Sequence, residues 1–363
     1  MTIEAVSDSP SAAKLASFAS TINQAVLEYS QATTESDRMS ALREVEVTSQ
    51  KLAHSIHAGR IDKESKGGPE LTRRIVRALG AMDIFEEVGE EIYQQTALSR
   101  EWNNKFMQSY TRYSWDNVMK TLCSYVDFFN FTGFVSPSDP MNSPFAFAKG
   151  VKDIDFFNLL QQDPKAAKTF NEAMTSFKDP LGDLYDFGSL SAGKDGVVLV
   201  DIGGGKGQSI QSICAAHPDL KGKFILQDLP GVVTAGDTVC SPDVEVQPYN
   251  FFKQVQPVKG AAAYLLKLIL HDWPDAECRT ILRNLAPAMR GHNSVLLICD
   301  IVLSDSRPDL QKLLYDINMS FVAGKERSVK QWHALLEGTG FRIQRIFGAD
   351  NPVRSIIEVV IDG

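Results

Sequence analysis

The stretch that decides the fold is Val197-Val-Leu-Val-Asp-Ile-Gly-Gly-Gly-Lys-Gly-Gln208. Its first four residues, Val197 to Val200, form a short apolar run, which is typical of a buried parallel strand. Glycines follow at positions 203, 204, 205 and 207, and residues 209–216 have the pattern of a helix. A strand, a glycine turn and a helix in this order predict a cradle for a nucleotide-like ligand, because glycine permits tight turns and close approach.

The spacing of the glycines excludes two common nucleotide loops. A dinucleotide fingerprint needs a glycine at the sixth position, which is Gln208 when counted from Gly203. No Gly-Lys-Ser/Thr follows, so a triphosphate loop is excluded as well. The remaining pattern, Gly203-x-Gly205-x-Gly207, resembles the loop of S-adenosylmethionine (SAM) dependent methyltransferases. A simple tight turn between a strand and a helix is the alternative.

A carboxylate at the end of the next strand supports a ligand site. Residues 223–226 predict that strand, and Asp228 ends it, about 20 residues beyond the glycines. In nucleotide-binding sheets a carboxylate at this place binds the diol of a ribose. The alternative role for Asp228 is to cap a helix or a turn.

Composition sets the broad class of the protein. The chain has 363 residues, 44% of them hydrophobic, which is enough for two domains with real cores. The net charge of −8 does not favour non-specific binding to nucleic acid. Five cysteines without a Cys-x-x-Cys pair predict no metal site and a reducing compartment. With no secretion signal and no stretch of about 20 apolar residues, we expect a cytoplasmic protein that does not bind a membrane.

The pattern along the chain predicts four regions. Residues 1–12 are expected to be a disordered tail, and residues 13–115 a mainly helical, winged-helix-like domain with a hairpin after residue 84, to which the family resemblance given below adds dimerisation. Residues 116–190 are expected to be a helical linker that lines the substrate. Residues 191–363 alternate strands and helices, as in a doubly wound parallel sheet. Arginines 73, 74 and 77 allow a DNA-facing helix, with a solvated face as the alternative.

Ligands of such sheets bind beyond the carboxyl ends of the strands, so residues after each strand are candidates. After the strand at 244–247 come Asn250 and Phe251, which suit an adenine ring by hydrogen bonding and stacking. Core packing is the alternative for Phe251. The strand at 261–266 leads to His271, and we expect this imidazole to face the ligand as a neutral base. Asp300, after the strand at 295–299, and Glu326 are candidates to flank it and to fix its tautomer.

Six motifs in order carry a family resemblance, which covers about residues 40–360. They are Arg74-Ile-Val-Arg-Ala-Leu79, Phe170-Asn-Glu-Ala-Met174, Asp201-Ile-Gly-Gly-Gly-Lys-Gly207, Gln227-Asp-Leu-Pro230, Leu270-His-Asp-Trp273 and Gly324-Lys-Glu-Arg327. The set resembles the plant caffeate/flavonoid O-methyltransferases and their fungal relatives. The resemblance implies a homodimer with an N-terminal winged helix and a C-terminal Rossmann-like SAM domain, which uses no metal.

The same resemblance implies roles for individual residues. His271 is implied as the general base for a small hydroxylated acceptor, with Asp300 and Glu326 beside it. The residues implied near SAM are Asp201, Gly203, Gly205, Gly207, Asp228, Leu229, Asn250, Phe251 and Lys267. Those implied around the acceptor are Phe170, Met174, Phe177 and Trp273. The family commonly has Asp at position 250 and Glu at position 300, so Asn250 and Asp300 are mild departures.

Two other functions fit the same sequence. Some relatives of this fold catalyse pericyclic or dehydration steps with SAM as a bound cation, and transfer no methyl group. The second alternative is a DNA-binding regulator that uses the winged helix. The abundance of phenylalanine favours an apolar or aromatic small molecule as substrate, without identifying it.

Overall fold

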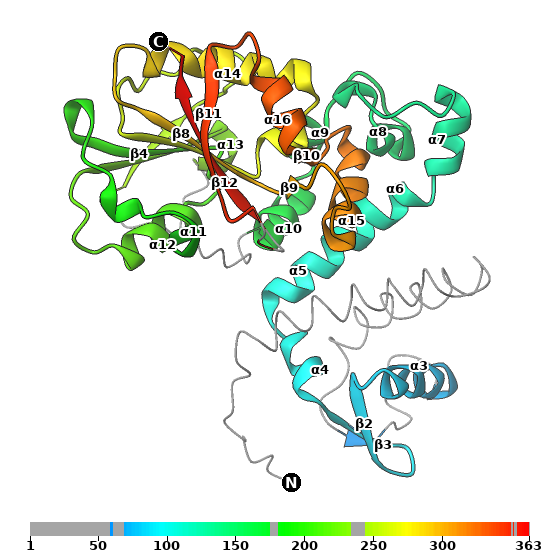
Figure 1. Ribbon diagram of the computed structural model, residues 1–363. Coiled ribbons are helices and arrows are strands. Elements are labelled where there is room, and N and C mark those ends of the chain that lie inside the picture. The colour runs from blue at the N-terminus through cyan, green and yellow to red at the C-terminus, as the bar shows by residue number, and fades with distance from the viewer. Residues whose placement is uncertain are drawn as a thin grey trace. The chain divides into compact units, whose positions relative to one another are not determined.

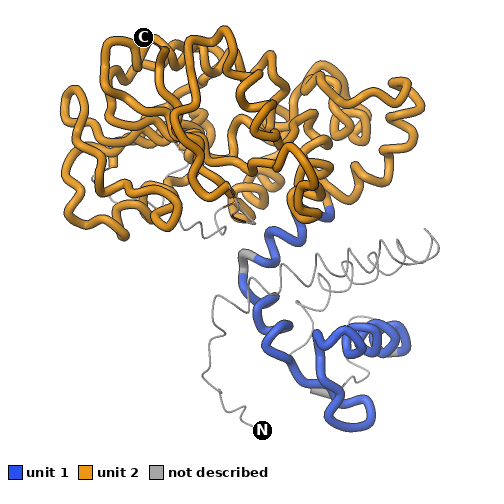
Figure 2. The backbone as a smooth tube through the Cα atoms, in the orientation of Figure 1, with its two compact units in different colours: residues 1–115 blue, residues 116–363 orange. Residues whose placement is uncertain are grey.

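The computed structural model describes residues 59–60, 69–174, 181–233, 244–349, 351 and 354–362. The chain divides into two compact units, residues 1–115 and residues 116–363, which are blue and orange in Figure 2. The tail expected at residues 1–12 and the helices expected at 13–30 and 38–57 lie outside the described residues.

The first unit contains a small sheet and three helices in its described part. The strands β1 (Gly59–Arg60), β2 (Phe85–Gly89) and β3 (Ile92–Gln95) pair antiparallel in the order β1-β3-β2. The helices are α3 (Pro69–Ala81), α4 (Ala97–Glu101) and α5 (Lys105–Tyr113). The hairpin predicted after residue 84 is therefore present, and α3 precedes it directly.

Apolar residues of α3 and the hairpin form the core of this unit. Val76 and Leu79 pack with Ile84, Phe85 and Tyr93, all at most 7% exposed. A helical period on α3 and alternation in the strands bring these side chains to one interface.

One of the three arginines on α3 already has an anionic partner. The Arg73 guanidinium donates to a carboxylate oxygen of Glu91 in the hairpin turn, with 3.1 Å between Nη2 and Oε2. The pair neutralises one charge of the arginine face that a DNA-binding helix would use.

Short helices precede the sheet of the second unit. The helical region expected at residues 116–190 is a series of short helices. The elements are the π-helix η1 (Ser114–Met119), α6 (Lys120–Leu122), α7 (Tyr125–Thr132), the 3-10 turn η2 (Pro140–Asn142), α8 (Pro144–Lys149), α9 (Phe156–Gln161), α10 (Pro164–Met174), α11 (Leu181–Leu184), η3 (Phe187–Ser189) and η4 (Lys194–Gly196). Helix α8 was not predicted, although Ser143 caps it and Pro144 occupies its first turn, which is a recognised start signal.

A seven-stranded sheet forms the second unit (Figure 1). Its strands are β4 (Val197–Ile202), β5 (Lys223–Asp228), β6 (Glu245–Pro248), β7 (Ala263–Lys267), β8 (Val295–Asp300), β11 (Phe341–Phe347) and β12 (Ser355–Ile361), in the order β11-β12-β8-β7-β4-β5-β6. The remaining elements are α12 (Gln208–Ala216), α13 (Pro230–Val233), η5 (Leu270–Asp272), α14 (Asp275–Met289), β9 (Val302–Leu303), α15 (Leu310–Met319), η6 (Ser320–Val322), β10 (Arg327–Ser328) and α16 (Val329–Leu336). The strand, glycine turn and helix predicted from residue 197 are thus found as β4, the loop and α12.

The expectation of a purely parallel sheet is wrong at one strand. Strands β4 to β8 pair in parallel, but β12 runs antiparallel to both of its neighbours, β8 and β11. Only residues 348–354 join β11 to β12. A parallel crossover needs a dozen or more residues, so two strands joined this closely must turn back on each other.

Two apolar cores cover the two faces of the sheet. One face packs α14 and α16 against residues such as Val200, Tyr264 and Leu296. The opposite face packs α11 and α12 against residues such as Val198 and Leu265. Successive strand residues point to opposite faces, so a strand covered on both sides is apolar throughout. The sheet is therefore a rigid support, and the strand ends carry the polar groups.

Candidate functional site

Asp228, at the end of β5, binds the backbone of the glycine loop (residues 203–207). The backbone amide of Gly205 donates to Oδ2 of Asp228 at 2.8 Å, and that of Leu229 donates to Oδ1 at 2.6 Å. Burial raises the pKa of Asp228, although these backbone hydrogen bonds oppose the rise. Each carboxylate oxygen has two lone pairs, so each keeps one acceptor site for a hydroxyl. Asp228 can therefore cap the turn and bind a diol at the same time.

The backbone of the glycine loop leaves no room for side chains larger than that of glycine at some of its positions. Gly203, Gly205 and Gly207 have φ angles of +71°, +61° and +92°, the left-handed region that favours glycine. A Cβ on Gly203 would lie 2.5 Å from Cδ1 of Ile269. Ile269 lies two residues before His271, so the loop and the histidine segment are in contact.

A carboxylate without a hydrogen-bond partner lies in β4, just before the loop. Asp201 is 1% exposed, and neither of its oxygens accepts a hydrogen bond from any residue that the structure describes. Burial raises its pKa to about 7; the charge of Lys267, at the end of the adjacent β7, opposes this rise and that of Asp228 adds to it. A buried acceptor of this kind fits a ligand with a cationic or hydrogen-bond-donating group.

The turn after β6 carries the predicted adenine residues. Asn250 uses its Oδ1 to accept from the backbone amides of Phe252 (3.0 Å) and Lys253 (3.2 Å). This hydrogen bonding caps the turn, which leaves the amide nitrogen for a ligand. Phe251 is half-buried, and its ring packs edge-on against Phe252, with 4.8 Å between the centroids. One carbon of the Phe251 ring lies 3.8 Å from the Cβ position of Gly203, so this turn adjoins the glycine loop.

His271 lies in η5, directly after β7. Leu268 has a φ of +54°, a conformation that is costly for a residue with a Cβ, and it turns the chain at the strand end. The His271 side chain is 11% exposed, with Nδ1 2.8 Å from Oε1 of Glu326. Its Nε2 is 3.6 Å from Oδ1 of Asp272, beyond hydrogen-bond length. Glu326 therefore engages Nδ1, and Nε2 is the nitrogen available to a ligand.

The pKa of the His271 imidazole lies above its ordinary value of about 6.5. Burial by itself lowers the pKa of His271, but the carboxylates of Glu326, Asp272 and Asp300 outweigh it and raise the pKa to about 10. Burial also raises the pKa of Asp272 to about 6 and that of Asp300 to about 7. Three acids thus surround one cation, and the protonated form of His271 is favoured.

The two carboxylates expected beside His271 differ in how they act. Glu326 contacts the imidazole, as described above. Asp300, at the end of β8, is fully buried, and neither of its oxygens has a hydrogen-bond partner within the described part of the chain. It raises the pKa of His271 through its charge alone.

The segment Gly324 to Arg327 fits against the backbone of His271. A Cβ on Gly324 would lie 2.2 Å from the His271 carbonyl oxygen, so only glycine allows this approach. The next amide, that of Lys325, donates to the same carbonyl at 2.8 Å. The amide of Glu326 donates to Oδ1 of Asp316 on α15 at 2.8 Å, which orients the Glu326 backbone.

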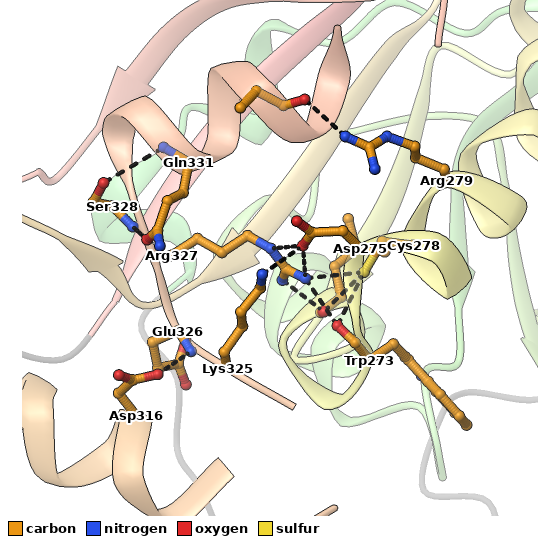
Figure 3. A network of polar contacts seen from close by, with 12 residues as sticks. Trp273, Asp275, Cys278, Arg279, Asp316, Lys325, Glu326, Arg327, Ser328 and Gln331 are labelled. Atoms are coloured by element: carbon orange, nitrogen blue, oxygen red, sulfur yellow. Dashed lines mark hydrogen bonds and ion pairs between the residues drawn. The ribbon is translucent and has the colours of Figure 1, made fainter. Parts of the chain in front are cut away.

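Arg327 is a residue of the site to which the sequence reasoning gave no role. Figure 3 shows its guanidinium among the carbonyl of Trp273, the Asp275 carboxylate and the Cys278 sulfur. Its side chain is 0% exposed. The signal was its place in the motif Gly324-Lys-Glu-Arg327, but no spacing rule connects it to the segment around His271.

Two of the four predicted acceptor residues, Phe170 and Trp273, belong to an aromatic cluster. Phe170 on α10 packs against Phe157 on α9, and Phe157 packs against Trp273, with 6.1 Å and 5.5 Å between the ring centroids. Phe170 is thus connected to Trp273, two residues beyond His271. Met174 is half-buried at the end of α10. Phe177 lies outside the described residues.

Two general features of the described chain bear on function. No group of three or more His, Cys, Asp or Glu side chains in the described residues is arranged to hold a metal ion. None of the helices in the same residues is long and apolar enough to cross a membrane.

Comparison with known sequences identifies related proteins. Residues 136–342 match the model of the O-methyltransferase domain family. The O-methyltransferase penK of Penicillium thymicola is 35% identical over 280 residues, which cover 76% of this chain and 66% of that protein. The O-methyltransferase agiB of Aspergillus flavus is 42% identical over 206 residues, which cover 55% of this chain and 69% of that protein.

Comparison with solved structures gives the same fold over nearly the whole length. LepI in complex with SAM has a TM-score of 0.83 and 26% identity, covering 94% of this chain and 93% of LepI. A structure titled as a pericyclic reaction enzyme has the same TM-score and identity, with 94% of each chain covered.

Proposed function

The chain belongs to the O-methyltransferase family, and we propose that it transfers the methyl group of SAM to a hydroxyl of a small aromatic or polyketide-like molecule, with His271 as the general base. The observation that carries the catalytic part is the buried contact between His271 Nδ1 and Glu326 Oε1, which leaves Nε2 for an acceptor hydroxyl. The contact of Ile269 with Gly203 supports the placement of this base beside the glycine loop.

The donor groups around the loop fit SAM. Asp228 offers two carboxylate acceptors for a ribose diol, and Asp201 offers a buried acceptor without a partner for the cationic part. In this proposal Gly203, Gly205, Gly207 and Leu229 supply the close backbone surface. Asn250 and Phe251 bind the adenine, and Lys267 balances the charge of Asp201. Phe170, Met174, Phe177 and Trp273 are proposed to surround the acceptor.

The proposed mechanism uses the two imidazole nitrogens differently. When bound, SAM supplies an electrophilic methyl group on a sulfonium centre. His271 removes the acceptor proton through Nε2 as the oxygen attacks, and Glu326 stabilises the resulting imidazolium at Nδ1. Positioning of the reactants contributes up to roughly 7–11 kcal/mol in well-oriented systems, and the base adds about 10²–10⁴-fold.

The high pKa of His271 constrains this mechanism. Only the neutral imidazole can accept a proton, and the carboxylates around it favour the charged form. A second positive charge in the site lowers the pKa of His271, because like charges disfavour the imidazolium. His271 therefore becomes a base most readily in the loaded site.

The direct test is incubation with SAM that carries an isotopic label in its methyl group. Phenolic and polyketide-like acceptors are offered in parallel, and products are analysed by mass spectrometry. We expect one labelled methyl group on an acceptor oxygen. If the whole panel stays unlabelled while SAM binds in calorimetry, methyl transfer to this class of acceptor is ruled out.

A second candidate function keeps SAM as a bound cation without methyl transfer. The likeness to the structure titled as a pericyclic reaction enzyme favours it, at 26% identity and a TM-score of 0.83. The same incubation separates the two functions. Conversion of a substrate to an unlabelled isomer or dehydration product supports the second candidate, and labelled product supports the first.

We propose that the first unit is a winged-helix dimerisation module. Helix α3 followed by the β2–β3 hairpin supports this assignment, and the family resemblance supports a homodimer. Light scattering tests it, with a dimer mass expected. A salt-dependent affinity for duplex DNA would instead favour the regulator alternative.

A further inference from the structure

We propose that Arg327 is a positioning residue for methyl transfer, because its guanidinium fixes the turn that carries His271 and so holds the imidazole against Glu326. This inference rests on the function proposed above. Figure 3 shows the side chain reaching from the strand β10 towards Trp273 and Asp275 at the start of α14.

The guanidinium binds the backbone on both sides of His271. Nη1 donates to the carbonyl of Leu270 at 2.9 Å, and Nη2 donates to the carbonyl of Trp273 at 2.8 Å. These carbonyls belong to the residue before His271 and to the second residue after it. The turn is weakly held by itself, since its own amide bonds from Asp272 and Trp273 are 3.2 and 3.3 Å long. Arg327 therefore adds two hydrogen bonds that are shorter than those within the turn.

The charge of Arg327 is compensated locally. Oδ1 of Asp275 accepts from Nε at 3.0 Å and from Nη2 at 2.8 Å, and Lys325 Nζ is 2.9 Å from the same oxygen. The guanidinium carbon lies 5.3 Å from the centre of the Trp332 ring, a cation–π distance. A buried cation held from this many sides has one fixed geometry.

Lysine cannot reproduce this arrangement. The guanidinium is a planar fork whose donors reach two carbonyls and a carboxylate at once, whereas an ammonium is a compact point charge on a flexible chain. Arg327→Lys therefore keeps the charge and removes the bridge, so it separates positioning from simple electrostatics.

The position of the imidazole also sets its protonation. The charged groups around His271 come from every neighbouring segment. They are Asp272 on its own turn, Glu326 and Lys325 from the facing loop, Asp300 from β8, Asp316 from α15, and Arg327 itself. If the turn loosens, the contact with Glu326 is the first to lengthen, and the pKa of His271 falls.

The test compares Arg327→Lys with Arg279→Lys. Arg279 lies on α14 and donates to the Ala334 carbonyl at 3.0 Å, so it binds α16 without touching the His271 turn (Figure 3). We expect Arg327→Lys to lower kcat at least about tenfold and to leave the Kd for SAM within about twofold. We also expect the rising limb of its pH–rate profile to move about one unit lower, and Arg279→Lys to match the wild type.

A milder variant guards against loss of folding. The Asp275 side chain is 38% exposed, so Asp275→Asn weakens one anchor of Arg327, by removing its charge, at a tolerant position. We expect it to shift kcat and the pH profile in the same direction, by at least about threefold in kcat. The proposal is overturned if either variant is folded and has both the kcat and the pH profile of Arg279→Lys.

An exchange measurement separates this proposal from the proposed function. Arg327→Lys is expected to speed amide hydrogen exchange in residues 269–275 without any substrate present. If the wild type transfers no methyl group, the proposed function fails and the exchange result alone decides the role of Arg327. Unchanged exchange in this segment overturns the proposal.

Discussion

At the scale of single residues, the charge of His271 is the decisive property. Three carboxylates raise its pKa to about 10, although burial works against them. The ligand-free site therefore favours a proton on the residue that we propose as the base. An imidazole held at Nδ1 by Glu326 has one nitrogen for catalysis, and its reactivity depends on the charges brought next to it.

The first prediction concerns this base. His271→Ala is expected to lower turnover at least about 10²-fold while SAM still binds, because the proton acceptor is lost and the donor cradle remains. Turnover assays and calorimetry measure the two effects. His333→Ala, at an exposed position of α16, is the control and should match the wild type. Undiminished turnover in the His271→Ala variant would exclude His271 as the base.

The second prediction concerns pH. Because the neutral imidazole is the active form, the methylation rate is expected to rise with pH up to the pKa of His271 in the loaded enzyme. Glu326→Gln removes the carboxylate that contributes most to the raised pKa of His271. The rising limb of the pH–rate profile should therefore move to lower pH, while kcat falls. If the rising limb of the pH–rate profile does not move in this variant, Glu326 does not set the pKa of His271.

The third prediction concerns Asp228. Asp228→Ala removes both acceptors of the carboxylate and frees the amides of Gly205 and Leu229. We expect SAM affinity to fall at least about tenfold, with a smaller effect on acceptor binding, since a lost pair of charged hydrogen bonds costs a few kcal/mol. Asp219→Ala, at an exposed position after α12, is the matched control. Equal affinities for SAM in calorimetry speak against the ribose role.

At the scale of elements, the site is made where two short segments meet. The turn η5 follows β7, and the loop before β10 packs against it from a distant part of the chain. Neither segment is long enough to be stable alone. The close approach of Gly324 to the His271 carbonyl, and the hydrogen bonds of Lys325 and Arg327, hold them together.

The fourth prediction tests this contact. Gly324→Ala places a methyl group 2.2 Å from the His271 carbonyl oxygen, which forces the two segments apart. We expect kcat to fall at least about tenfold and the melting temperature to drop, because backbone atoms must move. Gly231→Ala is the control, since a Cβ there meets nothing within 4 Å. Equal activity of the two variants would show that the segments can separate without harm.

At the scale of the whole second unit, two buried acids lie near the carboxyl ends of central strands of the sheet. Asp201 ends its apolar run in β4, and Asp300 ends β8, both nearly inaccessible and without hydrogen-bond partners among the described residues. Burying an unpaired carboxylate costs stability whenever it is ionised. The buried acids near the carboxyl ends of β4 and β8, where we propose that the ligand binds, therefore lower the stability of the ligand-free protein when they are ionised.

The fifth prediction follows from these acids. Burial raises the folded-state pKa of Asp201 and Asp300 to about 7, above the unfolded value. A raised pKa gives stability that is full below the unfolded pKa and is lost as pH rises through the folded pKa. The pKa of His271, raised to about 10, acts in the same direction at higher pH.

The melting temperature of the ligand-free protein is therefore expected to fall by at least about 3 °C between about pH 6 and about pH 8. Scanning calorimetry over this range measures it. Asp300→Asn should melt higher than the wild type at the alkaline end and change little at the acid end. A melting temperature that rises with pH in both proteins contradicts this account.

The sequence by itself determined the features that depend on local patterns. The apolar run, the glycines and the following helical period predicted β4, the loop and α12, because each is encoded by neighbours in the chain. The same reasoning placed Asp228 and His271 at strand ends. The helical region expected at residues 116–190 is divided into short helices, since local pattern defines the ends of elements poorly.

Only the tertiary structure decided which distant groups meet. The reversed direction of β12 follows from a connection too short for a crossover. The sequence named Glu326 as a candidate beside His271, but these residues are 55 positions apart, and no spacing rule fixes their contact or the raised pKa of His271. Arg327 became part of the site for the same reason, because charge and hydrogen bonding act through space and folding sets the distances.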